Sequence, residues 1–191
     1  LCRQLAREQV FQACGPLKWY SKFTPQLREI KAGSYLLKPG RDHRQLLELF
    51  SSGTEHQFSI TFVEGERMTD IMNKLANAEN LIHDITDQQR LAVQLNAAHD
   101  HIEGLLFPDT YYYAAGSSSF SIVLRAYKKM QDMLADQWLN RAVGLPYNTP
   151  YEALIMASII EKETGVAYER QLIASVFINR LNKNMRLQTD P

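Results

Sequence analysis

The chain has 191 residues, of which 45% are hydrophobic and 22% charged, an ordinary composition for a globular protein. Lysine plus arginine and aspartate plus glutamate number 21 each, so no basic excess points to nucleic acid, and no apolar run is long enough to cross a bilayer. The five histidines are scattered and no Cys/His set has the spacing of a metal site, so we expect neither a metal nor a cofactor.

The first part of the chain, up to about residue 64, predicts a small unit of helices and strands. Its expected elements are two helices, a strand, a third helix and a second strand, over residues 1–14, 17–23, 32–37, 42–53 and 57–63. In the third helix Asp42 suits the N-cap and Gly53 the stop. In the last strand Phe58, Ile60 and Phe62 alternate with polar residues, the pattern of a half-buried strand.

From residue 65 onwards helices dominate the prediction. They are expected over residues 69–78, 87–98, 117–140, 150–164 and 167–184, with a short strand or extended loop within residues 103–113. The serine triplet 117–119 caps one helix, and Thr149 and Pro150 suit the N-cap and first position of the next. The fold class is therefore α+β, with a small unit followed by a helix-rich one.

The helix of residues 150–164 carries the candidate catalytic group, Glu161. It is apolar nearly all round, so we expect it to be buried at the centre of the second unit. Apolar walls disfavour an ionised carboxyl group, and a protonated carboxyl group is what general acid catalysis needs at neutral pH. The alternative is that Glu161 ends in solvent beside Thr164 and Gly165. Spacing alone does not choose between these two interpretations.

One face of this helix is suited to receive a ligand. At about 100° per residue it holds Leu154, Ala157, Ser158 and Glu161. The small side chains of Ala157 and Ser158 leave a groove beside the carboxylate. Glu163 points about 200° away from Glu161, so we expect it to support the structure by pairing with a backbone donor or with a nearby base, for which Arg170 and Arg180 are candidates.

Other polar and aromatic residues give weaker signals. Asn179 could orient a sugar or the acid, although a solvated helix face is the better explanation for any single polar residue on this helix. Glu103 and Asp190 are possible helpers of the acid, and Gln188 is a further candidate for substrate binding or support. The aromatic cluster of Phe107 and residues 111–113 could stack on sugar faces or simply belong to the core.

The sequence from residue 157 onwards carries a specific resemblance to a known family. It resembles the endolytic murein transglycosylases of the MltG, or YceG-like, family over residues 157–164, 169–170, 174–181 and 185–191. Residues 103–111 and 144–147 resemble further parts of that family. The weaker segments 31–35 and 63–65 are similar to its LysM-like subdomain. The resemblance covers the whole chain.

The resemblance implies an enzyme of peptidoglycan metabolism that needs no cofactor. Such enzymes cleave the bond between N-acetylmuramic acid and N-acetylglucosamine within glycan strands, close to nascent cell wall, and leave 1,6-anhydro ends. The family's catalytic glutamate falls on Glu161. The implied domains are a LysM-like subdomain over residues 1–64 and the N-terminal portion of the catalytic domain over residues 65–191.

The resemblance also implies a place in the cell. It is the periplasmic face of the inner membrane, with a single-pass N-terminal anchor and with peptidoglycan synthases as possible partners. The chain begins with Leu1 rather than methionine and the family continues past Asp190-Pro191, so we expect the anchor and the rest of the catalytic domain to lie outside it. The rival hypothesis is a non-catalytic module that binds peptidoglycan and recruits synthases.

Overall fold

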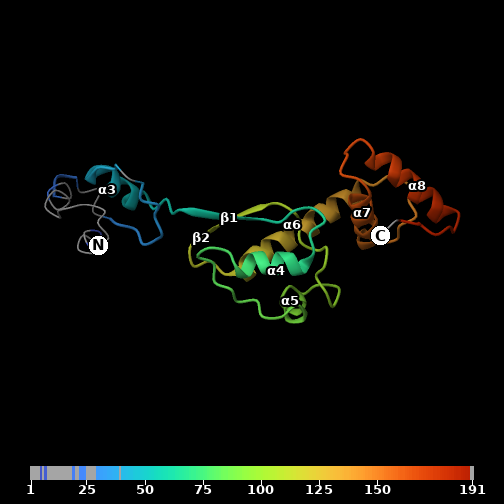
Figure 1. Ribbon diagram of the computed structural model, residues 1–191, viewed down its shortest axis with the longest axis horizontal. Coiled ribbons are helices and arrows are strands. Elements are labelled where there is room, and N and C mark those ends of the chain that lie inside the picture. The colour runs from blue at the N-terminus through green and yellow to red at the C-terminus, as the bar shows by residue number, and fades with distance from the viewer. Residues whose placement is uncertain are drawn as a thin grey trace. The chain divides into compact units, whose positions relative to one another are not determined.

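The structure is a computed structural model that describes Leu5, Arg7, Trp19 and residues 22–24, 29–38 and 40–189. Its elements, labelled in Figure 1, are α3 (His43–Ser52), β1 (Gln57–Thr61), α4 (Met68–Ala76), α5 (Gln88–Gln94), β2 (Thr110–Ala114), α6 (Ser119–Leu139), α7 (Pro150–Glu163) and α8 (Arg170–Asn182). This mixture of helices with a small sheet confirms the α+β prediction. The helices expected over residues 1–14 and 17–23 lie mostly outside the described residues.

The chain divides into two compact units. The first consists of residues 1–58 with 112–116, and the second of residues 59–111 with 117–191. The division passes through both strands, between Phe58 and Ser59 in β1 and between Tyr111 and Tyr112 in β2. The pocket described below belongs wholly to the second unit.

In the first unit, local signals set both ends of α3, as predicted. The Asp42 carboxylate accepts a hydrogen bond from the Gln45 N–H at 2.8 Å, and the Gln45 side chain accepts one from the Asp42 N–H at 3.2 Å, which completes a capping box. Gly53 ends the helix at φ +72°, a conformation that favours glycine. Leu46 and Phe50 of this helix are buried in one cluster with Leu5.

Residues 32–37 form no strand, so that prediction is wrong. The backbone hydrogen bonds of this stretch are isolated ones: the Ser34 carbonyl accepts from the His56 N–H at 2.7 Å, and the neighbouring Lys31 N–H donates to the Phe50 carbonyl at 3.0 Å. A strand needs a continuous ladder along a partner strand. The strand that begins just after His56 is β1, and it pairs with β2 instead.

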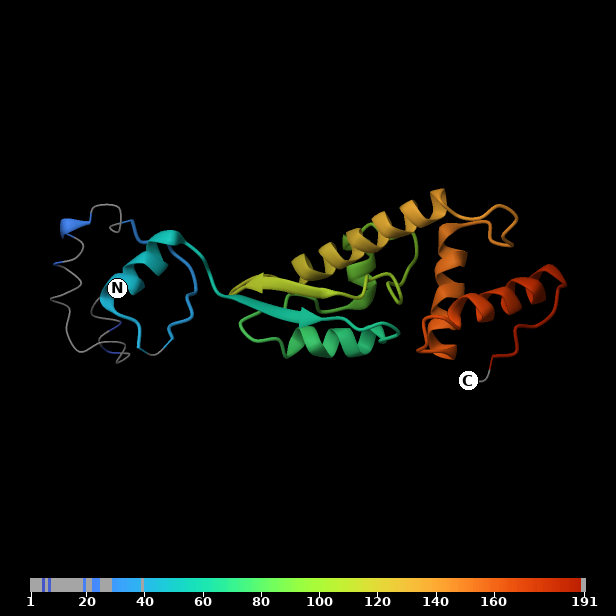
Figure 2. The ribbon, with the colours of Figure 1, turned by 90° about the horizontal axis from the view of Figure 1, so that it is seen from above.

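The sheet consists of β1 and β2, which run antiparallel in Figure 2. Tyr111 and Tyr113 are buried, whereas Tyr112 is 61% exposed. The Tyr111 hydroxyl donates to the Phe107 carbonyl at 2.6 Å, and burial, with the charge of Asp109 adding to it, raises the pKa of Tyr111 to about 12. Two of the three tyrosines are thus core residues. Of the three, the structure exposes only Tyr112 enough for stacking on a ligand.

The core of the second unit is built from α4, α5, α6 and the segments between them. Its most deeply buried hydrophobic side chains are Phe62, Met68, Leu75, Leu91, Ile102, Ile122, Val123 and Ala126. The long helix α6 supplies the last three, which share one face because Ala126 follows Val123 by three residues and Ile122 by four. Its N-cap is Ser118, within the serine triplet expected to cap it.

Asp84, in the segment between α4 and α5, forms hydrogen bonds to the start of α6. Its carboxylate accepts hydrogen bonds from the hydroxyls of Ser118 and Ser119 and from the Phe120 N–H at 3.0 Å. Burial raises the pKa of Asp84, but the hydrogen bonds from Ser118, Ser119 and Phe120 outweigh it, so the pKa lies below its ordinary value. The carboxylate therefore acts as a cap contributed from 36 residues upstream.

Helix α7 begins as predicted but is not buried as predicted. Thr149 caps it by accepting from the Glu152 N–H at 3.2 Å, and Pro150 takes the first position. Met156 is its one buried residue, and Ile155 is 45% exposed. Its main packing partners among the helices and strands are α6 and α8 (Figure 2), and its other residues are partly or fully exposed.

Helix α8 shows the same low burial. Phe177 is its one buried residue, whereas Leu172 is 68% exposed. In the part of the chain that the structure describes, no helix combines the length and the apolar character needed to cross a membrane.

Candidate functional site

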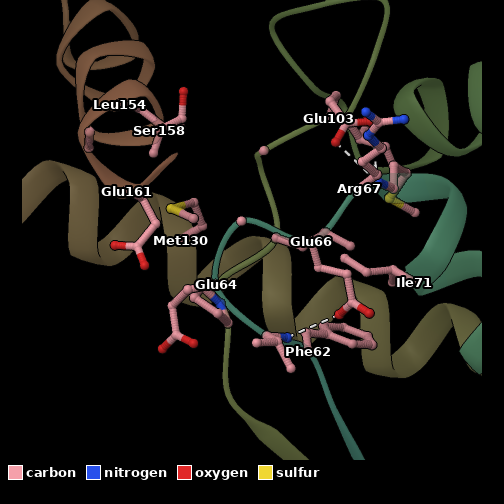
Figure 3. A pocket seen from close by; sticks show the side chains of 18 of the residues that line it. Phe62, Glu64, Glu66, Arg67, Ile71, Glu103, Met130, Leu154, Ser158 and Glu161 are labelled. Atoms are coloured by element: carbon pink, nitrogen blue, oxygen red, sulfur yellow. Dashed lines mark hydrogen bonds between the residues drawn. The ribbon is translucent and has the colours of Figure 1, made fainter. Parts of the chain in front are cut away.

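A pocket of about 510 Å³ lies beside α7 in the second unit (Figure 3). Its size falls within the range of small-molecule sites. One wall is α7, from Tyr151 to Lys162, and the opposite walls are residues 62–68 with Ile71 and residues 101–108. Met130 of α6 also lines it. These segments are far apart in sequence, so the fold alone assembles the pocket.

The α7 wall contains the face that helical spacing predicted. Its four residues, Leu154, Ala157, Ser158 and Glu161, all line the pocket. The side chain of Ser158 turns partly back to the helix, because its hydroxyl donates to the Ile155 carbonyl at 2.8 Å. Small side chains at 157 and 158 leave room above the helix, and Glu161 stands at the end of this groove.

Glu161 fits neither of the two environments considered from the sequence. Its side chain is 30% exposed, so it is neither enclosed by apolar walls nor free in solvent. Its carboxylate pairs with the Arg170 guanidinium, with Oε2 at 3.1 Å and Oε1 at 3.5 Å from Nη2. The premise of a desolvated acid is therefore wrong. The structure instead shows a partly exposed carboxylate that forms an ion pair with Arg170.

Glu163 was expected to pair with a nearby base, with Arg170 and Arg180 as candidates, or with a backbone donor, and it pairs with neither arginine. Glu163 is exposed, does not line the pocket and makes no side-chain hydrogen bond or ion pair with any described residue. Arg180, the other expected partner, donates to the Leu187 carbonyl. The separation of the two glutamates on α7 was correct, but the arginine lies on the side of Glu161.

Thr164 was not predicted as a site residue. It forms hydrogen bonds within the turn that precedes Arg170. It is buried, and its hydroxyl donates to the Glu169 carboxylate at 2.8 Å while accepting from the Val166 N–H at 3.0 Å. These bonds hold together the short connection between α7 and α8, and Arg170 is the first residue of α8. A threonine just past the helix end was the available signal, since such residues bond to nearby backbone.

Glu103 lies in the pocket, but its carboxylate is already engaged. Both of its oxygens accept from the Met68 N–H, at 3.0 and 3.2 Å (Figure 3). Met68 is the first residue of α4, whose N-cap Arg67 makes no side-chain cap bond. Glu103 therefore supplies the cap and the favourable negative charge at this helix start. Its place is structural support of the pocket wall.

Two further pocket acids, Glu64 and Glu66, were not predicted as site residues. Glu66 pairs with Lys74 at 2.6 Å and accepts from the Val63 N–H at 3.0 Å. Burial raises the pKa of Glu66, but these hydrogen bonds and the charge of Lys74 outweigh it, so the pKa is lowered. Glu64 is exposed and lines the pocket. The segment 63–65 stood out in sequence, but nothing there linked it to Glu161.

The remaining candidate residues are not brought to the pocket. Asn179 is exposed on α8 and Gln188 is exposed in the segment after it, and neither lines the pocket. Asp190 lies outside the described residues. Among the described residues no group of three or more His, Cys, Asp and Glu side chains could hold a metal ion. Of the candidate residues that the structure describes, the pocket therefore brings together Glu161 and Glu103.

Comparison with known proteins places the chain in a family. The sequence model of the YceG-like family matches residues 1–191, the whole chain. The chain belongs to the YceG-like family.

Curated relatives of this YceG-like chain carry a name that states an activity. The endolytic murein transglycosylase of Bacillus subtilis is 28% identical over 98% of this chain and 57% of its own length. That of Streptococcus pneumoniae D39 is 27% identical over 90% of this chain and 36% of its own length. The chain thus spans about half, or less, of these relatives.

A solved structure resembles the fold. The crystal structure of a yceG-like protein from Listeria monocytogenes aligns with a TM-score of 0.53 at 26% identity, over 98% of this chain and 67% of that one. The similarity extends along nearly the whole YceG-like chain, so it includes the segments that form the pocket.

Proposed function

We propose that this chain carries the glycan-cleaving site of an endolytic lytic transglycosylase, with Glu161 as its acid and base. The substrate is the bond between N-acetylmuramic acid and N-acetylglucosamine inside a peptidoglycan strand. The observation that carries the proposal is the position of Glu161: partly exposed, at the end of a groove over Ala157 and Ser158, in a pocket of about 510 Å³. The names of the relatives supply the substrate class.

In the proposed reaction Glu161 first donates a proton to the glycosidic oxygen. The bond from that oxygen to the muramic C1 breaks, and the leaving sugar keeps the proton. The muramic C6 hydroxyl oxygen then bonds to C1, and its proton passes to the Glu161 carboxylate. The nucleophile belongs to the same sugar, so it has a high effective concentration and no water is consumed. The product is a 1,6-anhydro end, and the proton from the C6 hydroxyl returns Glu161 to its starting protonation state.

Arg170 has a defined part in this cycle. After the first step Glu161 is a carboxylate, the state in which it pairs with the Arg170 guanidinium in the structure. A charge-assisted contact of this kind stabilises the carboxylate until it takes the proton from the C6 hydroxyl. Because the arginine is 44% exposed, it can move aside when Glu161 holds its proton.

The arrangement of the other pocket acids favours a single-carboxylate mechanism. Hydrolysis by a glycosidase usually requires a second carboxylate as nucleophile or base. Glu66 and Glu103 are both engaged in hydrogen bonds that hold the pocket wall. Among the predicted or newly found pocket acids of the described chain, Glu64 is therefore the one available to a hydrolytic mechanism. The two mechanisms leave different ends on the glycan.

The first part of the chain is proposed to be a LysM-like glycan-binding subdomain over residues 1–64, with residues 65–191 as the N-terminal portion of the catalytic domain. Its support is the cluster of Leu46 and Phe50 of α3 packed with Tyr35 and Leu37. We further propose that the protein works at the periplasmic face of the inner membrane, near peptidoglycan synthases. That place follows from the substrate, because nascent glycan strands are made there.

Mass spectrometry of the released fragments tests the proposed function. The protein, as its own cell produces it, is incubated with purified peptidoglycan, alongside Glu161→Gln and the matched control Glu163→Gln on the same helix. We expect anhydro-muramic ends from the native protein and from Glu163→Gln, and none from Glu161→Gln. Free reducing ends would favour hydrolysis through Glu64. Binding of glycan without any cleavage would favour the non-catalytic module.

A further inference from the structure

A long-range hydrogen bond joins two walls of the pocket close to Glu161. One wall is α7, and the other is the loop of residues 63–67. Lys162 Nζ donates to the Gly65 carbonyl at 2.7 Å, across 97 residues of sequence. Lys162 directly follows Glu161, and Gly65 directly follows Glu64. The bond therefore connects the neighbours of two pocket glutamates. It ties the turn at residues 64–66 to the last turn of α7.

The Gly65 position is built for this contact. Its φ of +69° favours glycine. A Cβ at residue 65 would lie 3.2 Å from Lys162 Nζ and 3.3 Å from Lys162 Cε. It would also lie 3.9 Å from Glu161 Cγ. The lysine side chain thus lies directly on the glycine, and the same turn touches the stem of Glu161.

The Lys162–Gly65 bond is a direct connection between these two walls. The main packing partners of α7 among the helices and strands are α6 and α8. Residues 63–67, by contrast, are a loop that precedes α4 and lines the pocket next to Glu161. The bond thus ties a loop of the pocket wall to the helix that carries Glu161.

We propose that Lys162 is a positioning residue that holds the Glu64–Gly65 turn against α7 and so sets the width of the pocket at Glu161. This inference rests on the proposed function, because the group being positioned is the sugar whose bond Glu161 breaks. With the bond in place, a muramic residue beside Glu161 is confined between Ser158 and the turn. Without it the turn can move away, and the glycosidic oxygen spends less time within reach of the acid.

The first test separates positioning from general support. Lys162→Met removes the donor and keeps the apolar stem, Lys162→Arg restores a donor, and Lys183→Met is an exposed lysine control outside the pocket. We expect Lys162→Met to lower kcat by about 10- to 100-fold with little change in KM, as for misplaced reacting groups. We expect Lys162→Arg to recover much of that loss and Lys183→Met to lose nothing. Equal kcat in Lys162→Met and Lys183→Met, or no recovery in Lys162→Arg, would overturn the proposal.

A glycine pair provides an independent test that does not alter the lysine. Gly65 and Gly144 both have positive φ, +69° and +84°, so alanine strains both backbones, but only at Gly65 does the added Cβ meet another side chain. We expect Gly65→Ala to lower kcat and Gly144→Ala to leave it near normal. In the Lys162→Met background, Gly65→Ala should add little further loss, because the bond is already gone. Full additivity would overturn the proposal.

Hydrogen exchange of the turn tests the contact even if no glycan is cleaved. Exchange of the amides of residues 64–66 is measured by mass spectrometry in the native protein, Lys162→Met and Lys183→Met. We expect faster exchange in this turn for Lys162→Met alone. Unchanged exchange would overturn the proposal. If the native protein cleaves nothing but exchange is faster in Lys162→Met, the proposed function is refuted. The Lys162–Gly65 contact and its effect on the turn are then still supported.

Discussion

Helices α6 and α7 are neighbours, but the more apolar of the two is the less buried one. Helix α6 mixes apolar and charged residues, yet it buries Ile122, Val123, Ala126 and Met130 on one stripe. Helix α7 is apolar nearly all round, yet it buries only Met156. In Figure 2 the end of α6 lies next to one end of α7, and α8 crosses α7 near its other end.

The difference shows that the apolar content of a helix does not by itself decide how far the helix is buried. An apolar stripe with a 3.6-residue period indicates which side of a helix packs against the core. A helix that is apolar on all sides gives no such indication. In α7 one uncovered side is the groove above Ala157 and Ser158, and this is the side that Glu161 shares. The low burial of α7 is thus what makes its face available to a ligand.

The largest effect that this comparison predicts is on activity at α7. Replacing Glu161 by glutamine removes the proton donor and acceptor with almost no change in shape. We expect glycan cleavage to fall by several orders of magnitude and the melting temperature to stay within about 2 °C, because a partly exposed ion pair such as that with Arg170 contributes little stability. Cleavage assays and thermal melts check both. A variant that stays active would remove Glu161 from its proposed role.

The next effect concerns stability and contrasts the two helices directly. Ile122 of α6 is fully buried, so Ile122→Ala should lower the free energy of unfolding by about 2–5 kcal/mol through lost burial and a cavity. Ile155 of α7 is 45% exposed, so Ile155→Ala should cost less than about 1 kcal/mol. Urea denaturation measures both. Similar losses at the two positions would mean that α7 is covered in solution.

A smaller effect is expected at the cap of α6. Asp84→Asn keeps the shape but loses the charge that accepts from Ser119 and the Phe120 N–H, so it should cost about 1 kcal/mol at pH 7, limited by exposure to solvent. The folded pKa of Asp84 lies below its ordinary value of 3.8. Its stabilisation is therefore fully present above the unfolded pKa and is lost as pH falls through the folded one.

Denaturant titrations at several pH values check this sign. The difference in stability between the native protein and Asp84→Asn should stay constant from pH 7 to about pH 5 and shrink below about pH 4. The carboxylates of Glu66 and Asp109, whose pKa values are also lowered, remain in both proteins and cancel in the difference. A difference that grows on acidification would contradict the assignment.

The smallest effect is expected two residues from the candidate acid. Glu163 is exposed and makes no side-chain hydrogen bond or ion pair with a described residue. Glu163→Gln should change the free energy of unfolding by less than about 0.5 kcal/mol and cleavage by less than about twofold. The same assays as for Glu161→Gln provide the comparison. An inactive but folded Glu163→Gln would exchange the roles of the two glutamates.

Sequence alone determined the features that depend on residues close together in the chain. The caps at Asp42, Ser118 and Thr149 and the stop at Gly53 were predictable, because each bonds to backbone within the adjoining turn or sets a local backbone angle. The pocket-facing side of α7 was predictable for a similar reason, since helix geometry alone relates residues 154 to 161. The family followed from contiguous stretches of residues.

Only the tertiary structure decided which distant groups meet. Glu103 caps Met68 from 35 residues away, and Lys162 reaches Gly65 across 97 residues. The exposure of α7 likewise depends on how the rest of the chain packs against it, which the residues of the helix do not specify. Periodicity describes one helix and contains no information on its neighbours, so these contacts had no signal in the pattern of residues. They arise when loops bring separate segments together, and the environment of Glu161 is set by that assembly.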